Sequence, residues 1–327
     1  MMKLLIRQQD EDIRLSRLPS LLNVDWSIEA VNHLDTDLWL ENLESVDAVI
    51  TMNWINPGVK CENLKLIQLP GAGLDGLDLD AIPKQTSVCN VFEHEIPIAE
   101  FVMAAILQGV TNLTQLDKNI RSNNWSGSYL FGPVHDELFG KTIGIIGYGH
   151  IGREVAKRIK PFGVQVIGCG PRIPTSGVQP DAFYTVEDLD TVLALSDFIL
   201  VSTPLTPETK GLISKTQFRK MKSSAIILNI ARGEVINEEA LYQACRDKEI
   251  GGAVIDTWYQ YPRSISDNTP PSRFNFSELD NVIMSPHAST WTDALIHRRT
   301  KFIAENLNRL SRRQPLLNVV KQSDKIK

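Results

Sequence analysis

The chain has 327 residues, of which 43% are hydrophobic and 22% charged, a composition typical of a folded protein long enough for two buried cores. Its formal net charge of −5 provides no basic field for a nucleic acid, and no apolar run is long enough to span a bilayer. The four cysteines lack the spacing of a metal site and no secretory segment follows Met1, so we expect a cytoplasmic location.

The first hundred residues alternate short apolar runs with helical or turn segments, which predicts a small α/β domain. The strand-like runs are residues 3–7, 47–51, 65–69 and 87–91. Pro97 then begins an apolar helix that continues to Leu107, with the proline in the first turn, where its missing N–H is not needed.

The run from Thr142 to Gly152 predicts a buried strand that turns, through three spaced glycines, into a helix. Gly147 permits the tight turn, Gly149 lets the backbone approach a pyrophosphate, and Gly152 lets the helix pack closely on the strand. The free amides and partial positive charge of the helix N-terminus suit phosphate groups. The pattern therefore predicts dinucleotide binding, with a purely structural turn as the alternative.

Five further apolar runs follow, and with the first strand they give six, the number in a doubly wound parallel sheet. They are residues 164–169, 198–202, 225–229, 252–256 and 281–284. A second long helix, residues 293–310, follows the last strand. We therefore predict two α/β domains, one inserted into the other, with a ligand in the cleft between them. The Pro-, Ser- and Asn-rich segment 261–277 is expected to be an ordered loop beside that cleft.

Further motifs stand at the carboxyl ends of the expected strands, where such sheets hold their ligands. They are Ser202-Thr203-Pro204-Leu205-Thr206-Pro207-Glu208-Thr209, Asn229-Ile230-Ala231-Arg232-Gly233, Asp256-Thr257-Trp258 and Ser285-Pro286-His287-Ala288-Ser289. With the glycine motif, this pattern closely resembles the D-isomer-specific 2-hydroxyacid dehydrogenases, most specifically over residues 141–290. The resemblance implies two doubly wound parallel-sheet domains: a Rossmann cofactor domain at residues 116–289, inserted into a flavodoxin-like substrate domain at residues 1–115 and 290–327.

The resemblance also implies which side chains carry the chemistry. Arg232 would bind the substrate carboxylate and polarise the 2-oxo group, a task that suits a rigid, charged fork of donors. His287 would protonate the carbonyl oxygen as hydride arrives, and act as base in reverse. The amides of Ala72 and Gly73 would hold the carboxylate as a small anion nest. His94 stands where many relatives carry an asparagine facing the cleft, and a substrate contact and a structural role are both open for it.

The cofactor, by the same resemblance, is held by the glycine loop and by residues at the ends of the neighbouring strands. These are Gly147, Gly149, His150, Ile151, Gly152, Arg172, Thr203, Pro204, Thr209, Ile230, Ala231, Asp256 and His287, with Asp256 near the nicotinamide carboxamide.

The chain departs from the family where the strand after the glycine loop ends. Relatives carry an aspartate there for the ribose hydroxyls, whereas this chain reads Gly168-Cys169-Gly170-Pro171-Arg172. Without the carboxylate a 2'-phosphate is no longer repelled, and Arg172 can pair with it. We therefore predict that NADP(H) is preferred over NAD(H), the alternative being that Arg172 points to solvent.

A second departure concerns the glutamate that normally pairs with the catalytic histidine. Tyr261 stands at that position, and Gln260 is the alternative partner if the loop shifts by one place. A neutral partner does not favour the imidazolium, so we expect His287 to donate a proton only at lower pH than in glutamate-bearing relatives.

These features together predict an NAD(P)-dependent 2-oxo acid reductase. Residues 51–54 offer no charge for a phosphate, which favours small or apolar substrates such as glyoxylate, hydroxypyruvate or an aryl pyruvate. One alternative is a pathway-specific biosynthetic dehydrogenase with an unusual substrate, and another is a catalytically vestigial dinucleotide sensor like the corepressors of this fold. The resemblance also implies a homodimer with residues 122–131 as the arm that crosses between subunits, and no nucleic-acid, membrane or metal partner is expected.

Overall fold

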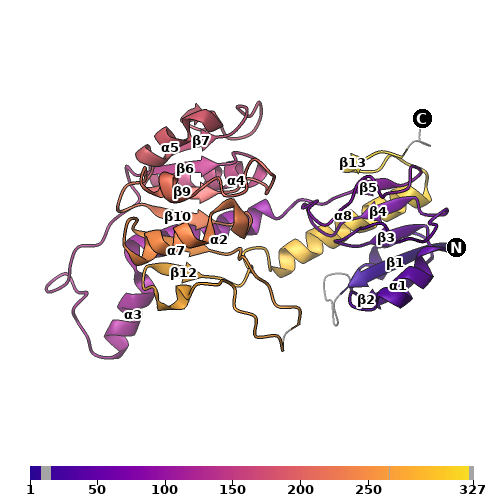
Figure 1. Ribbon diagram of the computed structural model, residues 1–327, viewed down its shortest axis with the longest axis horizontal. Coiled ribbons are helices and arrows are strands. Elements are labelled where there is room, and N and C mark those ends of the chain that lie inside the picture. Colours follow the sequence, from indigo (N-terminus) through magenta and orange to yellow (C-terminus); the bar gives the residue numbers. More distant parts are fainter. Residues whose placement is uncertain (9–15, 265, 324–327) are drawn as a thin grey trace. The chain divides into compact units, whose positions relative to one another are not determined.

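The computed structural model describes residues 1–8, 16–264 and 266–323, and it divides into two compact units (Figure 1). Unit 1 comprises Met1–Glu93 and Trp291–Lys327, and unit 2 comprises His94–Thr290. Each unit contains one mostly parallel sheet with helices packed on it, so the expected pair of doubly wound α/β domains is confirmed.

Unit 1 has a six-stranded sheet in the order β13-β5-β4-β3-β1-β2. The strands are β1 (Met2–Gln8), β2 (Trp26–Asn32), β3 (Ala48–Ile50), β4 (Leu66–Gln68), β5 (Ser87–Cys89) and β13 (Val319–Lys321). The helices are α1 (Thr36–Leu43) and α8 (Asp293–Ser311), with a 3-10 turn η1 (Pro19–Leu21). All neighbouring strands run parallel except β13, which pairs antiparallel with β5. The order 2-1-3-4-5 of the parallel strands is that of flavodoxin-like sheets.

The alternation of side chains along β1 shows why this sheet takes helices on both faces. Leu4 and Ile6 pack with Leu307 of α8, whereas Leu5 packs on the other face with Trp39 of α1. Because successive residues of a strand point to opposite faces, an uninterrupted apolar run requires cover on both sides.

Unit 2 has a seven-stranded, fully parallel sheet in the order β12-β11-β10-β9-β6-β7-β8. Its strands are β6 (Thr142–Ile146), β7 (Gln165–Cys169), β8 (Ala182–Tyr184), β9 (Phe198–Val201), β10 (Ile226–Asn229), β11 (Gly252–Ile255) and β12 (Val282–Met284). Its helices are α2 (Glu95–Thr111), α3 (Leu113–Arg121), α4 (His150–Ile159), α5 (Leu189–Leu195), α6 (Lys215–Phe218) and α7 (Glu238–Arg246). Short 3-10 turns are η2 (Lys160–Phe162), η3 (Val186–Asp188), η4 (Gly233–Val235) and η5 (Phe276–Glu278).

The strand order in unit 2 reverses between β6 and β9, which is the topological switch point where doubly wound sheets bind ligands. Because all seven strands are parallel, their carboxyl ends lie along one edge of the sheet. The glycine loop after β6 and the segments that follow β9, β10, β11 and β12 therefore share that edge.

Three strands were not expected from the sequence, namely β2, β8 and β13. The domain assignment of the helix that contains Pro97 also differs from the expectation. Residues 94–115 were expected in the first domain, whereas α2 lies in unit 2. The physical reason is its apolar face: Ile98, Val102 and Ile106 are buried in one cluster with Val155 and Ile159 of α4. The helix therefore belongs to the core of unit 2.

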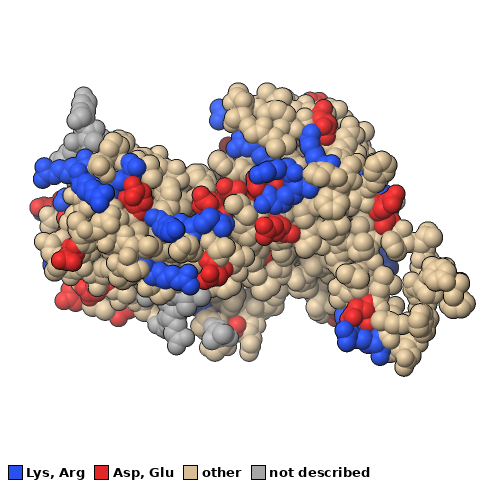
Figure 2. All heavy atoms as spheres, turned by 180° about the vertical axis from the view of Figure 1, so that it is seen from behind, with Lys and Arg blue, Asp and Glu red and all other residues tan. Residues whose placement is uncertain are grey.

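The surface seen in Figure 2 carries charges of both signs, with Lys and Arg beside Asp and Glu over much of that face. In the described part of the chain, no single helix is long and apolar enough to cross a membrane, although the bent pair of α2 and α3 reaches the required length and hydropathy together.

Candidate cofactor and catalytic site

The glycine loop after β6 has the geometry that its sequence predicts. Gly147 has φ of +91°, and a Cβ there would lie 2.6 Å from the backbone nitrogen of Thr203. A Cβ on Gly152 would lie 2.8 Å from Ile145 Cγ2, so the helix packs closely on its strand. A Cβ added to Gly149, by contrast, would have no neighbouring atom within 4 Å. The loop is thus tightly packed on the protein side and open at the position where a pyrophosphate would approach.

Helix α4 begins directly after this loop, with Gly149 as its N-cap and no side chain capping its first amides. Those amides and the helix dipole provide the anion-binding end that a dinucleotide requires. Ser202 Oγ donates to the Gly147 carbonyl over 2.9 Å and fixes the loop on the end of β9. The residues present therefore fit a dinucleotide cofactor.

The neighbouring candidate residues lie on the segments that follow β7 and β9. Thr209 Oγ1 donates to the Pro204 carbonyl over 2.6 Å, which closes the turn that starts after Thr203. Arg172 is exposed, and its side chain makes no ion pair within the described residues. An exposed guanidinium at this place agrees with both alternatives, a solvated side chain and a phosphate ligand.

Arg232 stands on a turn that the buried Asn229 holds at the end of β10. Asn229 Oδ1 accepts from the Ala231 amide over 3.1 Å, and its Nδ2 donates to the Arg232 carbonyl over 3.0 Å. The next residue must be glycine, because a Cβ at Gly233 would clash with the Trp258 carbonyl oxygen. The arginine is therefore presented by a turn with little freedom to move.

Asp256, at the end of β11, is fully buried and binds the loop that carries His287. Its carboxylate accepts from Ser285 Oγ over 2.7 Å, from the Ala288 amide over 2.9 Å, and from the amide and hydroxyl of Ser289. His287 itself has φ of +58°, a left-handed conformation that surrounding contacts must hold in place. Asp256 thus supports the histidine loop, and its expected contact with a nicotinamide stays a prediction.

Tyr261 is the side chain that contacts His287. Its Oη lies 3.1 Å from His287 Nδ1, and it also accepts from the Trp258 amide over 3.0 Å. Of the two candidate partners, Gln260 makes its hydrogen bond within the described residues through its backbone amide, which donates to the Pro271 carbonyl over 3.1 Å. The alternative in which Gln260 replaces the tyrosine is therefore not the arrangement that the structure adopts.

The pKa of His287 is lowered from its ordinary value. The main cause is burial of the imidazole by surrounding protein atoms, although the residue remains accessible to solvent, and the Arg232 cation adds to it while Asp256 opposes it. Burial also raises the pKa of Tyr261, so its hydroxyl stays protonated near neutral pH. The two groups are therefore a neutral pair at neutral pH.

The long segment after Tyr261 is attached to the rest of unit 2 at both of its ends. The amides of Tyr259 and Gln260 donate to the Pro271 carbonyl. Glu238 of α7 accepts from Ser272 Oγ and from Arg273 Nε, each over 2.8 Å. Residues 261–264 and 266–277 form the expected loop without long regular elements, its order stays a prediction, and residue 265 lies outside the described residues.

Ala72 and Gly73 lie in unit 1, on the segment that follows β4. Asn90 Nδ2 donates to the Ala72 carbonyl over 3.1 Å and holds this segment. Within the described residues, neither the Ala72 nor the Gly73 amide donates a hydrogen bond, so both are available to an anion. His94, the first residue of unit 2 and the N-cap of α2, is largely buried, with Nδ1 3.8 Å from Glu95 Oε2.

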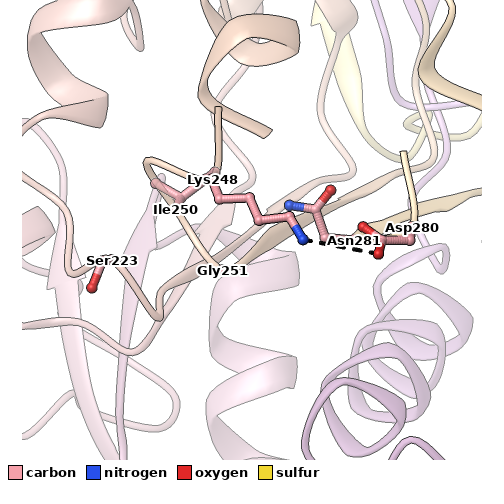
Figure 3. Close-up of a pocket in the computed structure, with 6 residues that line it drawn as sticks. All are labelled: Ser223, Lys248, Ile250, Gly251, Asp280 and Asn281. Carbon is pink, nitrogen blue, oxygen red and sulfur yellow. Dashed lines mark ion pairs between the residues drawn. The ribbon is translucent and has the colours of Figure 1, made fainter. Parts of the chain in front are cut away.

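A shallow pocket elsewhere on unit 2 is drawn in Figure 3. It is lined by Ser223, Lys248, Ile250, Gly251, Asp280 and Asn281. These residues stand before β10, β11 and β12, at the amino ends of the strands, so the pocket lies at the edge opposite to His287. Its one ion pair joins Lys248 and Asp280 at 4.0 Å, and both side chains are largely exposed. It is therefore separate from the candidate site.

Residues 103–289 match the model of the D-isomer specific 2-hydroxyacid dehydrogenase, NAD binding domain. The chain belongs to the D-isomer specific 2-hydroxyacid dehydrogenase family. It is 34% identical to a hydroxypyruvate reductase from Thermotoga maritima over 80% of this chain and 83% of that protein. It is 32% identical to a D-3-phosphoglycerate dehydrogenase from Methanocaldococcus jannaschii over 90% of this chain. The chain spans about half the length of the phosphoglycerate dehydrogenases that it matches, 55% and 47%.

Among solved structures of this family, the fold is similar to that of a probable 2-hydroxyacid dehydrogenase from Rhizobium etli, in complex with NADP, HEPES and L(+)-tartaric acid. The TM-score is 0.77 at 21% identity, and the alignment covers 98% of each chain. The resemblance inferred from the motifs is therefore confirmed for the family and for the fold.

The residues that hold the site together have no role that the sequence motifs alone assign. Asn229, Trp258, Ser285 and Ser289 each make a hydrogen bond that fixes a turn or the histidine loop. All four lie inside the motifs at the strand ends, so their proximity to Arg232 and His287 in the sequence was the available signal.

Proposed function

We propose that this chain reduces a 2-oxo acid to a D-2-hydroxy acid, and catalyses the reverse oxidation, with NADP(H) preferred over NAD(H). The observation that carries the proposal is the grouping of Arg232, Asp256, Tyr261 and His287 on the sheet edge that also bears the open glycine loop. We assign cofactor binding to unit 2 and, with the Ala72 and Gly73 amides, substrate binding to unit 1.

The roles of the chain's own residues follow from their chemistry. The Gly147–Gly152 loop and the first amides of α4 would hold the pyrophosphate, with Thr203, Pro204, Thr209, Ile230 and Ala231 on neighbouring segments of the same edge. When bound, the nicotinamide supplies the hydride that reduces C2 of the substrate. Arg232 would bind the carboxylate and draw electron density from the 2-oxo oxygen.

His287 would act as the general acid in reduction and as the general base in oxidation. In reduction, its imidazolium would give the Nε2 proton to the 2-oxo oxygen, and in oxidation its neutral Nε2 would take the proton from the hydroxyl. Because Tyr261 is bonded to Nδ1, Nε2 would be the nitrogen that meets the substrate. A general acid of this kind contributes roughly 10²–10⁴-fold to the rate.

The substrate class that we favour is a small or apolar 2-oxo acid such as glyoxylate, hydroxypyruvate or phenylpyruvate. Met52 and Asn53, after β3, carry no charge that would pair with a phosphate. Relatives named hydroxypyruvate reductase and glyoxylate reductase support this class, whereas those named phosphoglycerate dehydrogenase extend well beyond the region that they share with this chain.

We also propose a homodimer located in the cytoplasm. The segment after α3 exposes Trp125, Tyr129 and Phe131 at 62%, 95% and 76%, which a second subunit would cover. All four cysteines are free and buried, as suits a protein kept in a reducing compartment.

The test is to follow NADPH and NADH oxidation with glyoxylate, hydroxypyruvate, pyruvate and phenylpyruvate from about pH 5 to about pH 8. We expect turnover that His287→Ala lowers by about 10²–10⁴-fold. The matched control is His33→Ala, in unit 1 and outside the site, which should retain full activity. Measurable cofactor binding without turnover on any of these acids would instead support the dinucleotide sensor or a specialised substrate.

A further inference from the structure

The Tyr261 hydroxyl oxygen accepts one hydrogen bond in addition to its contact with His287. The Trp258 amide can only donate, and it donates to Tyr261 Oη over 3.0 Å. This contact takes one lone pair and leaves the hydroxyl with one lone pair and one proton. His287 Nδ1, at 3.1 Å, is the other polar atom bonded to Oη within the described residues.

Trp258 fixes both members of this pair. Its backbone amide holds Tyr261, and its indole Nε1 donates over 2.7 Å to the carbonyl of Ser285, two residues before His287. The indole is buried and packs edge-on against Phe276, with ring centroids 5.9 Å apart. Because one buried residue contacts both segments, the distance between Oη and Nδ1 is set by the core rather than by the exposed loop.

The charged groups that face His287 come from two other segments. Arg232, on the turn after β10, disfavours the imidazolium, while Asp256, at the end of β11, favours it. The Asp256 carboxylate is already bonded to Ser285, Ala288 and Ser289 of the histidine loop. No carboxylate is bonded to Nδ1 within the described residues, so the ring's immediate partner is uncharged.

We propose that Tyr261 is the positioning residue of His287: its uncharged hydroxyl, held by the Trp258 amide, orients the imidazole and sets the pH range in which each direction of the reaction is supported. This inference rests on the proposed reductase function and deepens it.

The proton balance follows from this arrangement. In reduction the imidazolium keeps its Nδ1 proton, which makes a hydrogen bond to Tyr261 Oη. It releases its Nε2 proton to the substrate oxygen while the C2–H bond forms with hydride from the nicotinamide. The phenol keeps its own proton throughout, and the neutral imidazole regains a proton from solvent. Oxidation reverses these steps: Nε2 accepts the hydroxyl proton and the hydride returns to the cofactor.

The direction of the pH effect follows from the lowered pKa of His287, whose ordinary value is 6.5. The protonated acid is present below the lowered pKa and is lost as the pH rises through it. Reduction should therefore begin to fall off at a pH below 6.5, whereas the neutral base needed for oxidation is present at and above that pH. Placing a carboxylate at position 261 should move both limits upward.

The experiment combines steady-state kinetics with NMR titration of the His287 ring. Tyr261→Glu, Tyr261→Phe and Gln260→Ala are compared with the parent protein in full-length form, and His287→Gln assigns the signal. We expect Tyr261→Glu to raise the His287 pKa by about one unit or more and to shift the pH limit of reduction by the same amount. Tyr261→Phe should lower kcat by about 10–100-fold with the KM for the cofactor unchanged, as expected for a lost orienting contact. Gln260→Ala should change neither.

Two results would overturn the proposal: an unchanged His287 pKa in Tyr261→Glu, or a larger effect of Gln260→Ala than of the Tyr261 variants. If the glutamate variant does not fold, Tyr261→Phe still decides, because loss of the contact must alter kcat and the titration of the ring. If the parent protein shows no turnover but its His287 pKa depends on residue 261, the reductase function fails and the pairing stands. Turnover with a pKa that is independent of residue 261 would mean that the reductase function stands and the pairing fails.

Discussion

Arg172 is the residue at which cofactor choice can be tested by one substitution. It follows the Gly170-Pro171 turn after β7, it is exposed, and no acid stands between the end of β7 and Arg172. We expect Arg172→Ala to raise the KM for NADPH by roughly 10- to 100-fold, because a charge-assisted hydrogen bond to a phosphate contributes about 1.5–3 kcal/mol. The KM for NADH should stay unchanged, since NADH has no 2'-phosphate.

The control for that variant is Arg219→Ala, which removes another exposed arginine, in the turn after α6. It should leave both KM values as they are. An equal rise in both KM values in Arg172→Ala would contradict a role in phosphate recognition and would place the arginine in general cofactor binding.

Gly147 and Gly149, both in the loop between β6 and α4, allow packing and cofactor binding to be tested separately. Gly149→Ala adds a methyl group into open space, whereas Gly147→Ala places one 2.6 Å from the Thr203 nitrogen at φ of +91°. We expect Gly147→Ala to lower the free energy of unfolding by more than about 1 kcal/mol. Gly149→Ala should unfold at nearly the parent temperature and still bind the dinucleotide at least about tenfold more weakly, because the methyl group occupies the approach of the pyrophosphate.

Thermal unfolding and cofactor titration of both variants test this difference. A Gly149→Ala protein that binds as tightly as the parent would show that the open space beside this glycine is not the path of the cofactor. A Gly147→Ala protein as stable as the parent would show that the loop can move away from β9.

The sequence predicted best those elements whose apolar runs are buried on both faces. The strand expected to begin the glycine motif at Thr142 is β6 (Thr142–Ile146), in which every residue from Ile143 to Ile146 is buried. The strand β8 (Ala182–Tyr184) was missed because it is three residues long, lies at the sheet edge and is only partly buried. The antiparallel β13 (Val319–Lys321) was missed because its pairing with β5 depends on where α8 returns the chain.

The part of the candidate site that could be predicted from the sequence is the set of single residues in motifs at the strand ends. Arg232, His287 and Tyr261 could be named from motifs, because parallel strands bring their carboxyl ends to one edge. What decides between Tyr261 and Gln260 is the Trp258 amide, and a backbone hydrogen bond leaves no mark on residue type. The placement of α2 in unit 2 was likewise not predicted, because an apolar helix face does not by itself specify the core against which it packs.

At the scale of the whole molecule, the exposed apolar segment after α3 predicts a second copy of the chain as its partner. Figure 1 shows α3 and the loop that follows it standing away from the sheet of unit 2. Trp125, Tyr129 and Phe131 are largely exposed there, and Val134 is 98% exposed. With Leu130, which is 63% exposed, five large apolar side chains in ten residues form a surface that water disfavours, and burial of each contributes about 1.5–3 kcal/mol.

We expect light scattering to give twice the mass of one chain for the parent protein, and the mass of a single chain for the double variant Trp125→Ser, Phe131→Ser at low micromolar concentration. Ile55→Ser, which removes a 75% exposed apolar side chain from unit 1, is the matched control and should remain dimeric. Far-UV circular dichroism should be the same for all three proteins, because the substituted side chains lie outside the buried clusters. A parent protein that is monomeric at all concentrations would mean that these aromatics serve another partner, whereas a double variant that stays dimeric would move the subunit contact to another face of unit 2.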